Sequence, residues 1–425
     1  MTIAALYNLF LQHPSVQTDT RKLQPGDIYF ALKGDNFDGN LFAGQALEKG
    51  AAYAVIDNAA YKINDQMILV EDVLTTLQQL AKYHRQQFNI PFIAITGSNG
   101  KTTSKELVHA VLSTTYKTYT TEGNLNNHIG IPLTILKIKA DAEIAVIEMG
   151  ANHQQEIAGY CKYALPTHGV ITNAGKAHLE GFGGEAGVKK GKGELFDYIR
   201  EHKGTVFIMN DYDYLQEMSK GISEVITYGT HDAMVVGTVV SSDTFLQVNM
   251  LSGSYTGLLQ TKLVGDYNLP NVLLAATVGQ YFKVTAENIK GALEGYTPSN
   301  SRSQLMVKGT THIIMDAYNA NPSSMKLAIE NFSRQPETKK VLMLGAMAEL
   351  GGESLQEHQA IIDTISKYNW QQVVLVGGDF LKLSHPYLQF NNAAEAKEWY
   401  TGQDMDNTSI LIKGSRSMQM EKIIG

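Results

Sequence analysis

Short apolar segments separated by glycine and polar turns recur along the chain, and their lengths predict an α/β protein. Continuous apolar runs at residues 92–96, 144–148, 169–172 and 205–209 are each followed by a turn and a stretch with helical spacing. Strands that are buried on both faces of a parallel sheet show this continuous pattern, because neither face meets water. The middle of the chain is therefore predicted to form a parallel sheet covered by helices.

The residues before this sheet predict a small α/β domain. Apolar runs at residues 28–32 and 52–56 alternate with Gly- and Asp-rich turns, and a helical pattern follows that ends before Pro91. Proline disfavours a helical conformation in the residue that precedes it. We place the first domain boundary near residue 86.

The residues after the central sheet predict a third domain. The turn-rich segment 295–301 precedes another series of buried-type strands, at residues 312–315, 341–344, 373–376 and 410–412. Each strand is followed by a polar or glycine turn and helical spacing, which is typical of a doubly wound, Rossmann-like sheet.

Alternating segments between residues 235 and 263 predict antiparallel strands at the edge of the central domain. The predicted domains are residues 1–86, 87–297 and 298–425.

Composition narrows the class of protein. The 425 residues are 44% hydrophobic and 18% charged, as in ordinary soluble domains, and 35 Lys and Arg oppose 42 Asp and Glu. No basic run is long enough for a nucleic-acid arm, and no stretch approaches the roughly 20 apolar residues that a membrane helix needs. Cys161 is the one cysteine, so an intramolecular disulfide is excluded. We expect a cytoplasmic protein with no nucleic-acid partner and no membrane insertion.

The sharpest motif follows the run at residues 92–96 and opens a helical pattern. It consists of Gly97, Ser98, Asn99, Gly100, Lys101, Thr102 and Thr103. Glycines let backbone N–H groups approach phosphate oxygens, a lysine neutralises their charge, and a threonine hydroxyl is a ligand for Mg²⁺. A strict phosphate loop has glycine where Ile95 stands. Nucleotide binding is predicted, but an ordinary GTPase or kinase is disfavoured.

Three charged or polar features follow the strands of this sheet, and the first of them is a candidate for metal binding. Glu148 ends a predicted strand and is a suitable oxygen ligand for Mg²⁺, although a solvated glutamate is the alternative. His178 follows the next strand, and a single histidine is more often structural. Lys189, Lys190 and Lys192 lie close together, which usually marks a solvated helix face. Spacing alone does not select Lys192.

Two further clusters lie at helix starts or strand ends. Asn268 and Asn271 stand at the entrance of a predicted helix, where simple capping is the alternative. Residues 316–322, which read Asp-Ala-Tyr-Asn-Ala-Asn-Pro, follow a predicted strand and are dense in hydrogen-bonding side chains. An Asn-Pro turn without a binding role is the alternative there.

Taken together, these motifs resemble the Mur ligase family, the ATP-dependent amide-forming enzymes of peptidoglycan precursor synthesis, over essentially the whole chain. The phosphate loop, Glu148, His178, the Lys192-Gly193-Glu194 segment, the Asn268 and Asn271 pair, Arg302 and Asp316 occur in the family's order. Segments 121–134, 316–322 and 344–351 are most similar to the member that adds a dipeptide. Ala346, Tyr267 and Thr20 depart from the Asp, His and Ser that are common at their positions.

The resemblance implies three domains, which bind a UDP-sugar, bind ATP, and close on ATP with the amino substrate. It implies that ATP phosphorylates the terminal carboxylate of UDP-N-acetylmuramoyl-tripeptide, and that D-alanyl-D-alanine attacks the acyl phosphate. The chain would then be an ATP-dependent amide-bond-forming ligase, expected as a monomer. Folylpolyglutamate synthetase shares the phosphate loop and the reaction logic and is the nearest alternative. A nucleotide-regulated binding protein without ligase activity is a second alternative.

The resemblance also implies roles for individual residues. Lys101 and Thr102 would address the ATP phosphates and Mg²⁺, and two Mg²⁺ sites would use Glu148, His178 and a carbamylated Lys192. Asn268 and Asn271 would approach the adenine, Arg302 the γ-phosphate and Asp316 the ribose. The candidates for substrate binding are Thr20, Arg21, Asn124, Asn126, Asn127, Tyr318 and Asn319.

Overall fold

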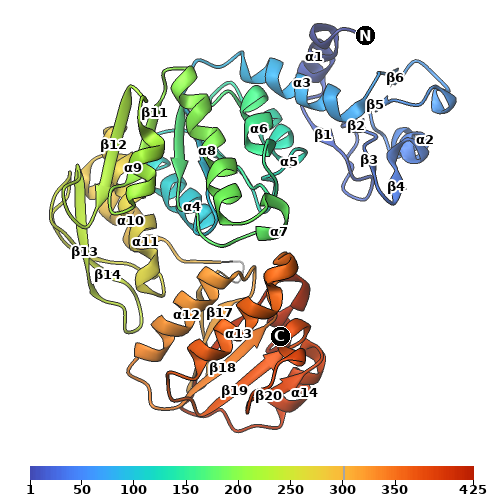
Figure 1. The fold of residues 1–425 in the computed structure, drawn as a ribbon. Helices are drawn as coiled ribbons and strands as arrows, with labels where there is room; N and C mark the ends of the chain where they lie inside the picture. The colour runs from blue at the N-terminus through green and yellow to red at the C-terminus, as the bar shows by residue number, and fades with distance from the viewer. Residues whose placement is uncertain (300–301) are drawn as a thin grey trace. The chain divides into compact units, whose positions relative to one another are not determined.

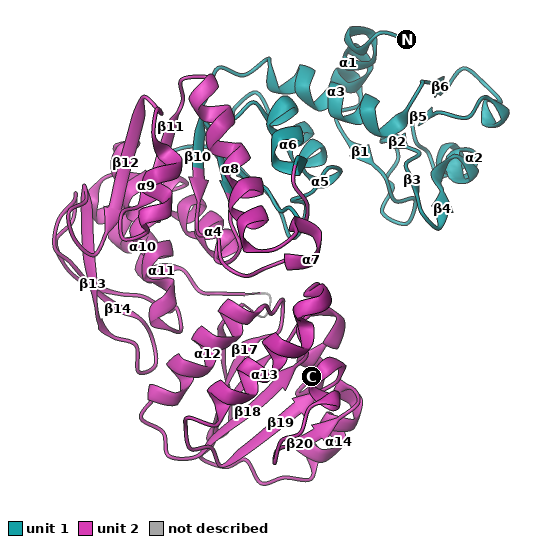
Figure 2. Ribbon diagram, in the orientation of Figure 1, with its two compact units in different colours: residues 1–95, 116–151, 155–169 teal, residues 96–115, 152–154, 170–425 magenta. Residues whose placement is uncertain are grey.

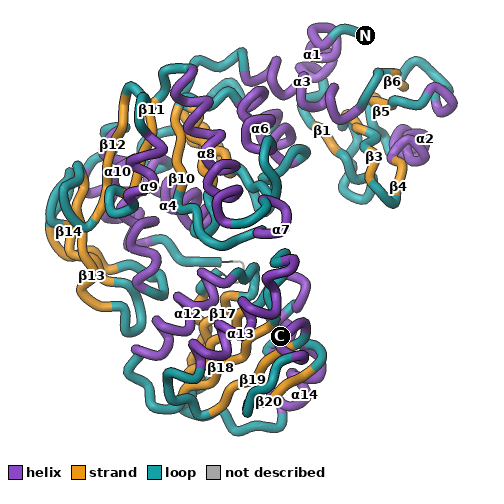
Figure 3. Tube along the Cα trace, in the orientation of Figure 1, coloured by secondary structure: helices purple, strands orange, loops and turns teal. Residues whose placement is uncertain are grey.

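The computed structural model describes residues 1–299 and 302–425, and the chain divides into two compact units (Figure 1, Figure 2). The first unit consists of residues 1–95, 116–151 and 155–169. The second consists of residues 96–115, 152–154 and 170–425. Helices and strands alternate along the chain (Figure 3), which confirms the predicted α/β class. Among the described residues, no helix has the length and apolar character needed to cross a membrane.

The first unit begins with a parallel sheet in the order β1-β2-β5-β6. Its strands are β1 (Val16–Gln17), β2 (Ile28–Phe30), β5 (Tyr53–Ile56) and β6 (Met67–Leu69). A short antiparallel pair, β3 (Lys33–Gly34) and β4 (Phe37–Asp38), follows β2. Helix α1 spans Ile3–Gln12, α2 spans Ala43–Glu48 and α3 spans Val73–Arg85. Asp72 caps the start of α3 by accepting the Thr75 N–H. The helix ends before Pro91, as predicted.

A nine-stranded sheet follows in the order β15-β14-β13-β12-β11-β10-β7-β9-β8. Its strands are β7 (Phe92–Thr96), β8 (Thr118–Thr120), β9 (Ile144–Glu148), β10 (His168–Ile171), β11 (Thr205–Met209), β12 (Glu224–Gly229), β13 (Val235–Ser241), β14 (Gln247–Met250) and β15 (Gly257–Gln260). Strands β7, β9 and β11 are buried at every position, which explains their uninterrupted apolar sequences. Strands β13, β14 and β15 pair antiparallel, as predicted.

The helices that accompany this sheet alternate with its strands along the sequence. They are α4 (Lys101–Leu112), α5 (Gly130–Leu136), α6 (Glu156–Ala164), α7 (Leu179–Phe182), α8 (Glu185–Glu201), α9 (Asp213–Ser219), α10 (Leu269–Tyr281) and α11 (Ala286–Gly295). Helix α10 is buried almost all round, and it packs on α4 and on strands β11 to β13 of the second unit. This packing fixes the start of α4, where the phosphate loop ends.

The C-terminal part of the second unit is a six-stranded sheet in the order β16-β17-β21-β18-β19-β20. Its strands are β16 (Gln304–Lys308), β17 (Thr311–Asp316), β18 (Lys340–Gly345), β19 (Gln372–Val376), β20 (Leu388–Phe390) and β21 (Ser409–Lys413). Helices α12 (Pro322–Arg334) and α13 (Ser354–Ile365) pack together, and α14 (Ala393–Thr401) joins the apolar cluster on the sheet (Figure 1). All strands except β16 pair in parallel.

The register of this sheet places three strand ends side by side. Asp316 at the end of β17 is opposite Lys413 of β21, and Lys413 is opposite Leu344 of β18. The loops that follow these strands therefore leave the same edge of the sheet, where ligands of open α/β sheets bind. Of the predicted boundary segment 295–301, Asn300 and Ser301 lie outside the described residues.

Candidate functional site

The glycine loop after β7 has a conformation that only glycine allows. Gly97 has φ of +143° and Gly100 has φ of +79°. A Cβ atom would lie 2.0 Å from the Thr172 hydroxyl oxygen at Gly97 and 2.7 Å from Asn271 Oδ1 at Gly100. Lys101 Nζ donates to the carbonyl oxygens of Gly97, at 2.6 Å, and Ser98, at 3.2 Å, so its charge lies over the loop. This geometry is suited to an anionic phosphate group.

The segment after β10 fixes the same loop. The Ser98 N–H donates to the Asn173 carbonyl oxygen at 2.9 Å, and the Asn99 N–H donates to Asn173 Oδ1 at 3.0 Å. The Thr172 hydroxyl donates to the Asn99 carbonyl oxygen at 2.6 Å, and the Ser98 hydroxyl donates to the Gly175 carbonyl oxygen at 2.8 Å. The loop is thus held in one shape by hydrogen bonds from a neighbouring strand end.

Asn268 and Asn271 brace helix α4 from the other side. Ser104 Oγ donates to Asn271 Oδ1 at 2.9 Å, Asn271 Nδ2 donates to Asn268 Oδ1 at 2.8 Å, and Asn268 Nδ2 donates to the Val264 carbonyl oxygen at 2.8 Å. Both asparagines are buried. Asn268 occupies the N-cap position of α10, but its side chain makes no capping bond there, so simple capping does not explain this residue. The pair supports the position of the phosphate loop.

His178 and Lys192 occupy distinct environments in the second unit. His178 has φ of +52° at the start of α7, and its Nδ1 contacts the carboxylate of Glu349, in the loop after β18. This hydrogen bond holds the pKa of the Glu349 carboxyl below its usual value. Lys192 is 1% exposed in α8, with its Nζ 4.8 Å from the centre of the Phe182 ring, whereas Lys190 is exposed. Burial thus separates Lys192 from its neighbours, which spacing alone does not.

Glu148 lies in the first unit, where it forms hydrogen bonds with polar residues that include another predicted site residue. Its side chain is buried at the end of β9, its N–H donates to the Thr121 hydroxyl at 3.0 Å, and Asn126 Nδ2 donates to its Oε1 at 2.8 Å. Asn127 Oδ1 accepts the Gly130 N–H at 2.8 Å and so stabilises the start of α5, while Asn124 is exposed. The structure therefore joins Glu148 and Asn126 directly.

The candidates near the N-terminus are more exposed. Arg21 forms an ion pair with Asp19 at 2.8 Å, in which the Arg21 side chain is 87% exposed. The hydrogen bonds from Arg21 lower the pKa of Asp19 to about 2. Thr20 presents its carbonyl oxygen to Lys49 Nζ at 3.0 Å. These residues form an exposed turn between β1 and β2 of the first unit.

Residues 316–322, which we call the acceptor loop after the role that the family resemblance implies, are organised around a buried lysine. Lys413 Nζ donates to Asp316 Oδ2 at 2.5 Å and to the Asn319 carbonyl oxygen at 3.2 Å, and its side chain is 3% exposed. The guanidinium of Arg302 lies 3.7 Å from the centre of the Tyr318 ring, close enough for a cation–π interaction. Asp316, Tyr318 and Arg302 are thus brought together.

Sequence reasoning missed Lys413 and Glu349 as site residues. Lys413 ends a buried strand and precedes Gly414 and Ser415, as Asp316 ends β17, so its position at a strand end was the available indication. Glu349 has φ of +62° in the loop after β18, and its contact with His178 links residues 171 positions apart. Such a contact depends on packing, which one sequence does not reveal.

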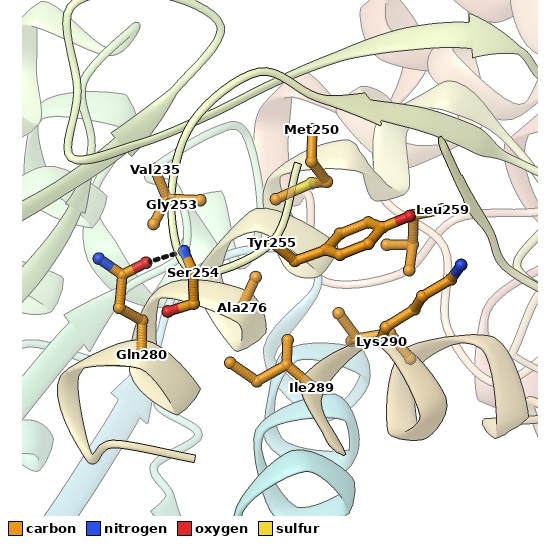
Figure 4. Close-up of a pocket in the computed structure, with 11 residues that line it drawn as sticks. Val235, Met250, Gly253, Ser254, Tyr255, Leu259, Ala276, Gln280, Ile289 and Lys290 are labelled. Carbon is orange, nitrogen blue, oxygen red and sulfur yellow. Dashed lines mark hydrogen bonds between the residues drawn. The ribbon is translucent and has the colours of Figure 1, made fainter. Parts of the chain in front are cut away.

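The cavity shown in Figure 4 lies elsewhere in the second unit and is lined by none of the predicted site residues. Its walls come from the antiparallel strands β13 to β15 and from helices α10 and α11. Tyr255, Ile289 and Lys290 face it, and Gln280 Oε1 accepts the Ser254 N–H at 2.6 Å. Its lining is mainly apolar and offers no cluster suited to a phosphate.

The donor atoms of the predicted metal ligands decide whether these residues suit Mg²⁺. The carboxylate of Glu148 and the hydroxyl of Thr102 are hard oxygen donors of the kind that Mg²⁺ prefers. An unmodified Lys192 ammonium has no lone pair, so it fits only as a carbamate. No group of three or more His, Cys, Asp or Glu residues suited to a metal occurs in the part of the chain that the structure describes. The predicted set contains only two residues of those types.

The fold and the site together define a nucleotide-binding α/β protein with a short phosphate loop and a second doubly wound sheet. Three family models match the chain: the Mur ligase family, catalytic domain at residues 14–85, the Mur ligase middle domain at residues 95–279, and the Mur ligase, glutamate ligase domain at residues 301–416. The chain belongs to the Mur ligase family.

Individual relatives agree with this assignment. The UDP-N-acetylmuramoyl-tripeptide–D-alanyl-D-alanine ligase of Bacillus subtilis (strain 168) is 35% identical over 427 residues, covering 96% of this chain and 92% of that protein. A crystal structure of MurF from Acinetobacter baumannii has a TM-score of 0.87 at 30% identity and covers 96% of this chain and 92% of its own. MurF ligase from Thermotoga maritima, in complex with ADP, has a TM-score of 0.86 at 26% identity, with 97% of both chains covered.

Proposed function

We propose that this protein ligates D-alanyl-D-alanine to UDP-N-acetylmuramoyl-tripeptide with hydrolysis of ATP to ADP and phosphate, in peptidoglycan precursor synthesis. The observation that supports this proposal best is the pairing of a phosphate loop with an acceptor loop at the end of a second parallel sheet. The relative from Bacillus subtilis is named for the same reaction and is similar over nearly its whole length. The Thermotoga maritima structure with ADP supports ATP as the nucleotide.

The chemistry requires activation of a carboxylate, which is a poor electrophile. A carboxylate oxygen of the tripeptide attacks the γ-phosphorus of ATP, and ADP leaves with the electrons of the broken P–O bond. The amine nitrogen of D-alanyl-D-alanine then attacks the carbonyl carbon of the acyl phosphate. Inorganic phosphate leaves, the nitrogen loses a proton, and an amide bond remains. The protein's main tasks are to position the reactants and to neutralise phosphate charge.

Residues of the second unit suit the nucleotide. Lys101 would neutralise phosphate charge, and the backbone from Gly97 to Thr103 would contact phosphate oxygens. Arg302 would approach the γ-phosphate and Asp316 the ribose. Asn268 and Asn271 would lie on the adenine side, and their hydrogen bonds to α4 also support the loop. These assignments rest on motif position in the Mur ligase family.

A divalent cation completes the proposed site. Mg²⁺ would supply positive charge that stabilises the transferring phosphoryl group. Thr102, Glu148 and His178 would hold it at two positions, together with the oxygens of a carbamate on Lys192. Lys192 is buried in α8, with its side-chain end beside the Phe182 ring.

The remaining candidates would bind the two other substrates. Tyr318 and Asn319 in the acceptor loop would contact the dipeptide. Thr20, Arg21, Asn124, Asn126 and Asn127 would contact the UDP-sugar. We retain the domain limits 1–86, 87–297 and 298–425, with a monomer in the cytoplasm, as parts of this proposal.

A substrate panel tests the proposal. Phosphate release and ligated mass should be measured with Mg-ATP, UDP-N-acetylmuramoyl-tripeptide and D-alanyl-D-alanine, with L-alanyl-L-alanine as the matched acceptor control. Rapid turnover is expected only with the D,D-dipeptide, because the acyl phosphate is consumed only when the amine of the accepted dipeptide attacks it. Faster turnover with a folate and glutamate would identify a folylpolyglutamate synthetase instead. No stimulation by any acceptor would favour a nucleotide-regulated binding protein.

A further inference from the structure

Asn321, in the acceptor loop, contacts the phosphate loop directly. Its side chain is buried, and its Nδ2 donates to Asn99 Oδ1 at 2.8 Å. At the other end of the same amide, Asn321 Oδ1 accepts the Ser324 N–H at 2.9 Å, and this bond caps helix α12. Because the helix cap fixes the rotamer of Asn321, the amide nitrogen is held in position for Asn99.

Among the hydrogen bonds seen in the described residues, the bond from Asn321 is the only one that the Asn99 side chain makes. Strand end β10 holds the Asn99 backbone, through its N–H to Asn173 and its carbonyl oxygen to Thr172 and Asn173. The Asn99 side-chain oxygen is left for Asn321. The backbone of the loop thus depends on β10, and the orientation of the Asn99 side chain depends on the acceptor loop.

Neighbouring contacts join the segments around the two loops independently of this bond. Lys176 forms an ion pair with Glu357 of α13 at 2.6 Å. Ser323 Oγ lies 3.1 Å from where a Cβ on Gly175 would stand. A third link lies further along α12, where the buried Asn331 donates to Ser242 Oγ at 3.2 Å. Loss of the Asn321 bond would therefore leave these parts in contact, and its effect on the loop can be isolated.

We propose that Asn321 is a positioning residue for ATP, which fixes the orientation of the Asn99 side chain in the phosphate loop. It makes the orientation of this side chain depend on the acceptor loop, so that ATP is held best when residues 316–322 are in place. This inference rests on the proposed function for the identity of the nucleotide, but its central measurement is a binding affinity.

The test compares substitutions that keep the helix cap. Asn321→Ser retains a capping oxygen but is too short to reach Asn99. Asn321→Asp also caps, but it lacks the amide N–H that donates to Asn99, and it adds a negative charge beside the phosphate loop. Asn99→Ala removes the acceptor. The matched control is Asn331→Ser, which removes a buried asparagine bond from the same helix without touching the phosphate loop.

The dissociation constant of a non-hydrolysable ATP analogue with Mg²⁺ should be measured by calorimetry for each protein. We expect it to rise about fivefold in Asn321→Ser and in Asn99→Ala, the loss typical of one neutral hydrogen bond, and more in Asn321→Asp. Combining Asn321→Ser with Asn99→Ala should add little, because both remove the same bond. The KM for ATP should rise similarly, with the KM for UDP-tripeptide unchanged. Asn331→Ser should leave all these values at the wild-type level.

Three results would overturn the inference: an unchanged dissociation constant in Asn321→Ser, additive losses in the double variant, or an equal loss in Asn331→Ser. Thermal unfolding of each variant identifies any protein that fails to fold, and Asn99→Ala then serves as the second probe of the same bond. If wild-type protein binds the analogue but ligates no dipeptide, the proposed function fails while the positioning role of Asn321 remains measurable.

Discussion

The phosphate loop and the acceptor loop of the second unit each connect a strand to a helix, but they begin that helix in different ways. Both follow a parallel strand and lead into a helix. At the phosphate loop, Gly100 precedes α4 with φ of +79° and has no side chain that could cap the helix. At the acceptor loop, Asn321 and Ser324 form a capping box on α12, and Pro322 takes the first helical position.

This difference decides what each loop can bind. Without a capping side chain, the start of α4 presents its backbone and dipole to a phosphate group. The start of α12 is occupied by its own side chains, so it does not offer the same anion site. Under the proposed function, recognition at the acceptor loop would come from side chains. The Lys413 pair with Asp316 and the Arg302 contact with Tyr318 hold these side chains in place. The phosphate loop keeps its shape because no side chain fills the space at its glycines. The acceptor loop keeps its shape because charged side chains pair within it.

The largest expected effect removes a charge that neither loop supplies. Lys101 is the one charged residue of the phosphate loop. The proposed anionic metal ligands, Glu148 and a carbamate on Lys192, therefore lie outside the loop. Lys192→Ala should lower turnover about a thousandfold with normal folding, since several kcal/mol of transition-state stabilisation would be lost. Added acetate should restore part of the rate. Turnover is measured by phosphate release in buffers with and without bicarbonate.

Lys190→Ala is the matched control, because this lysine is exposed two residues away in the same helix. It should retain wild-type turnover. If Lys192→Ala remained active in bicarbonate-free buffer, the carbamate assignment would be wrong even though the family is established.

The second-largest expected effect tests whether ATP binding at the phosphate loop requires the absence of a side chain at Gly97. In Gly97→Ala the new methyl group would lie 2.0 Å from the Thr172 hydroxyl oxygen, so the loop must move. We expect ATP-analogue affinity to fall about a hundredfold, as clash and backbone strain together cost about 3 kcal/mol. In the acceptor loop, Asn319→Ala should leave this affinity unchanged, because Asn319 is exposed. Calorimetry measures both.

Gly159→Ala, in α6, is the control for the glycine substitution, because a Cβ there meets no atom within 4 Å and its φ is not positive. Equal losses of affinity in Gly97→Ala and Asn319→Ala would remove the contrast between the two loops.

The third effect tests whether the acceptor loop depends on a charge pair. Asp316→Ala would leave the Lys413 charge buried without its carboxylate, and the free energy of unfolding should fall by about 3 kcal/mol. Replacing both residues, Asp316→Ala with Lys413→Met, should recover most of this stability without recovering turnover. Urea titrations give the stability difference. Arg334→Gln, which breaks an ion pair with Asp266 that is more exposed, should cost less than about 1 kcal/mol.

If Asp316→Ala and Arg334→Gln lowered the free energy of unfolding equally, burial of Lys413 would not make its ion pair more important for stability than the exposed pair. The double variant identifies the cause, since a loss that it does not recover comes from packing of the loop instead of from an unpaired charge.

The sequence predicted the parts of this comparison that depend on local chemistry. Strands β7, β9 and β11 match the predicted ranges, because complete burial leaves an unbroken apolar run. Strand β16 was not predicted: it is partly exposed, pairs antiparallel with β17, and has only three apolar residues, which stand between two polar ones. Its pattern resembles that of the surrounding loops.

The same division applies to the site residues. The glycine loop was predictable, because spacing and residue type determine its chemistry. The bond from Asn321 to Asn99 joins residues 222 positions apart, and Lys413 is recognisable only after the register places it opposite Asp316. Long-range contacts of this kind follow from how sheets pack, which spacing along one chain does not encode.

The smallest expected effect concerns an exposed ion pair, the counterpart of the buried pair at Asp316. Arg21 lowers the pKa of Asp19 to about 2, so the pair stabilises the folded protein above the ordinary carboxyl pKa of about 3.9, and this stabilisation is lost as pH falls through about 2. In Arg21→Gln, the pKa of Asp19 should rise toward about 3.9, as followed by NMR of the carboxyl carbon. Because Arg21 is exposed, the thermal midpoint at pH 7 should fall by only about 1 °C, and the difference from wild type should shrink between pH 4 and pH 2. A rise in the KM for UDP-tripeptide beyond this small change in stability would support a role of Arg21 in substrate binding, whereas an Asp19 pKa that stays near 2 in the variant would show that another group holds the carboxylate.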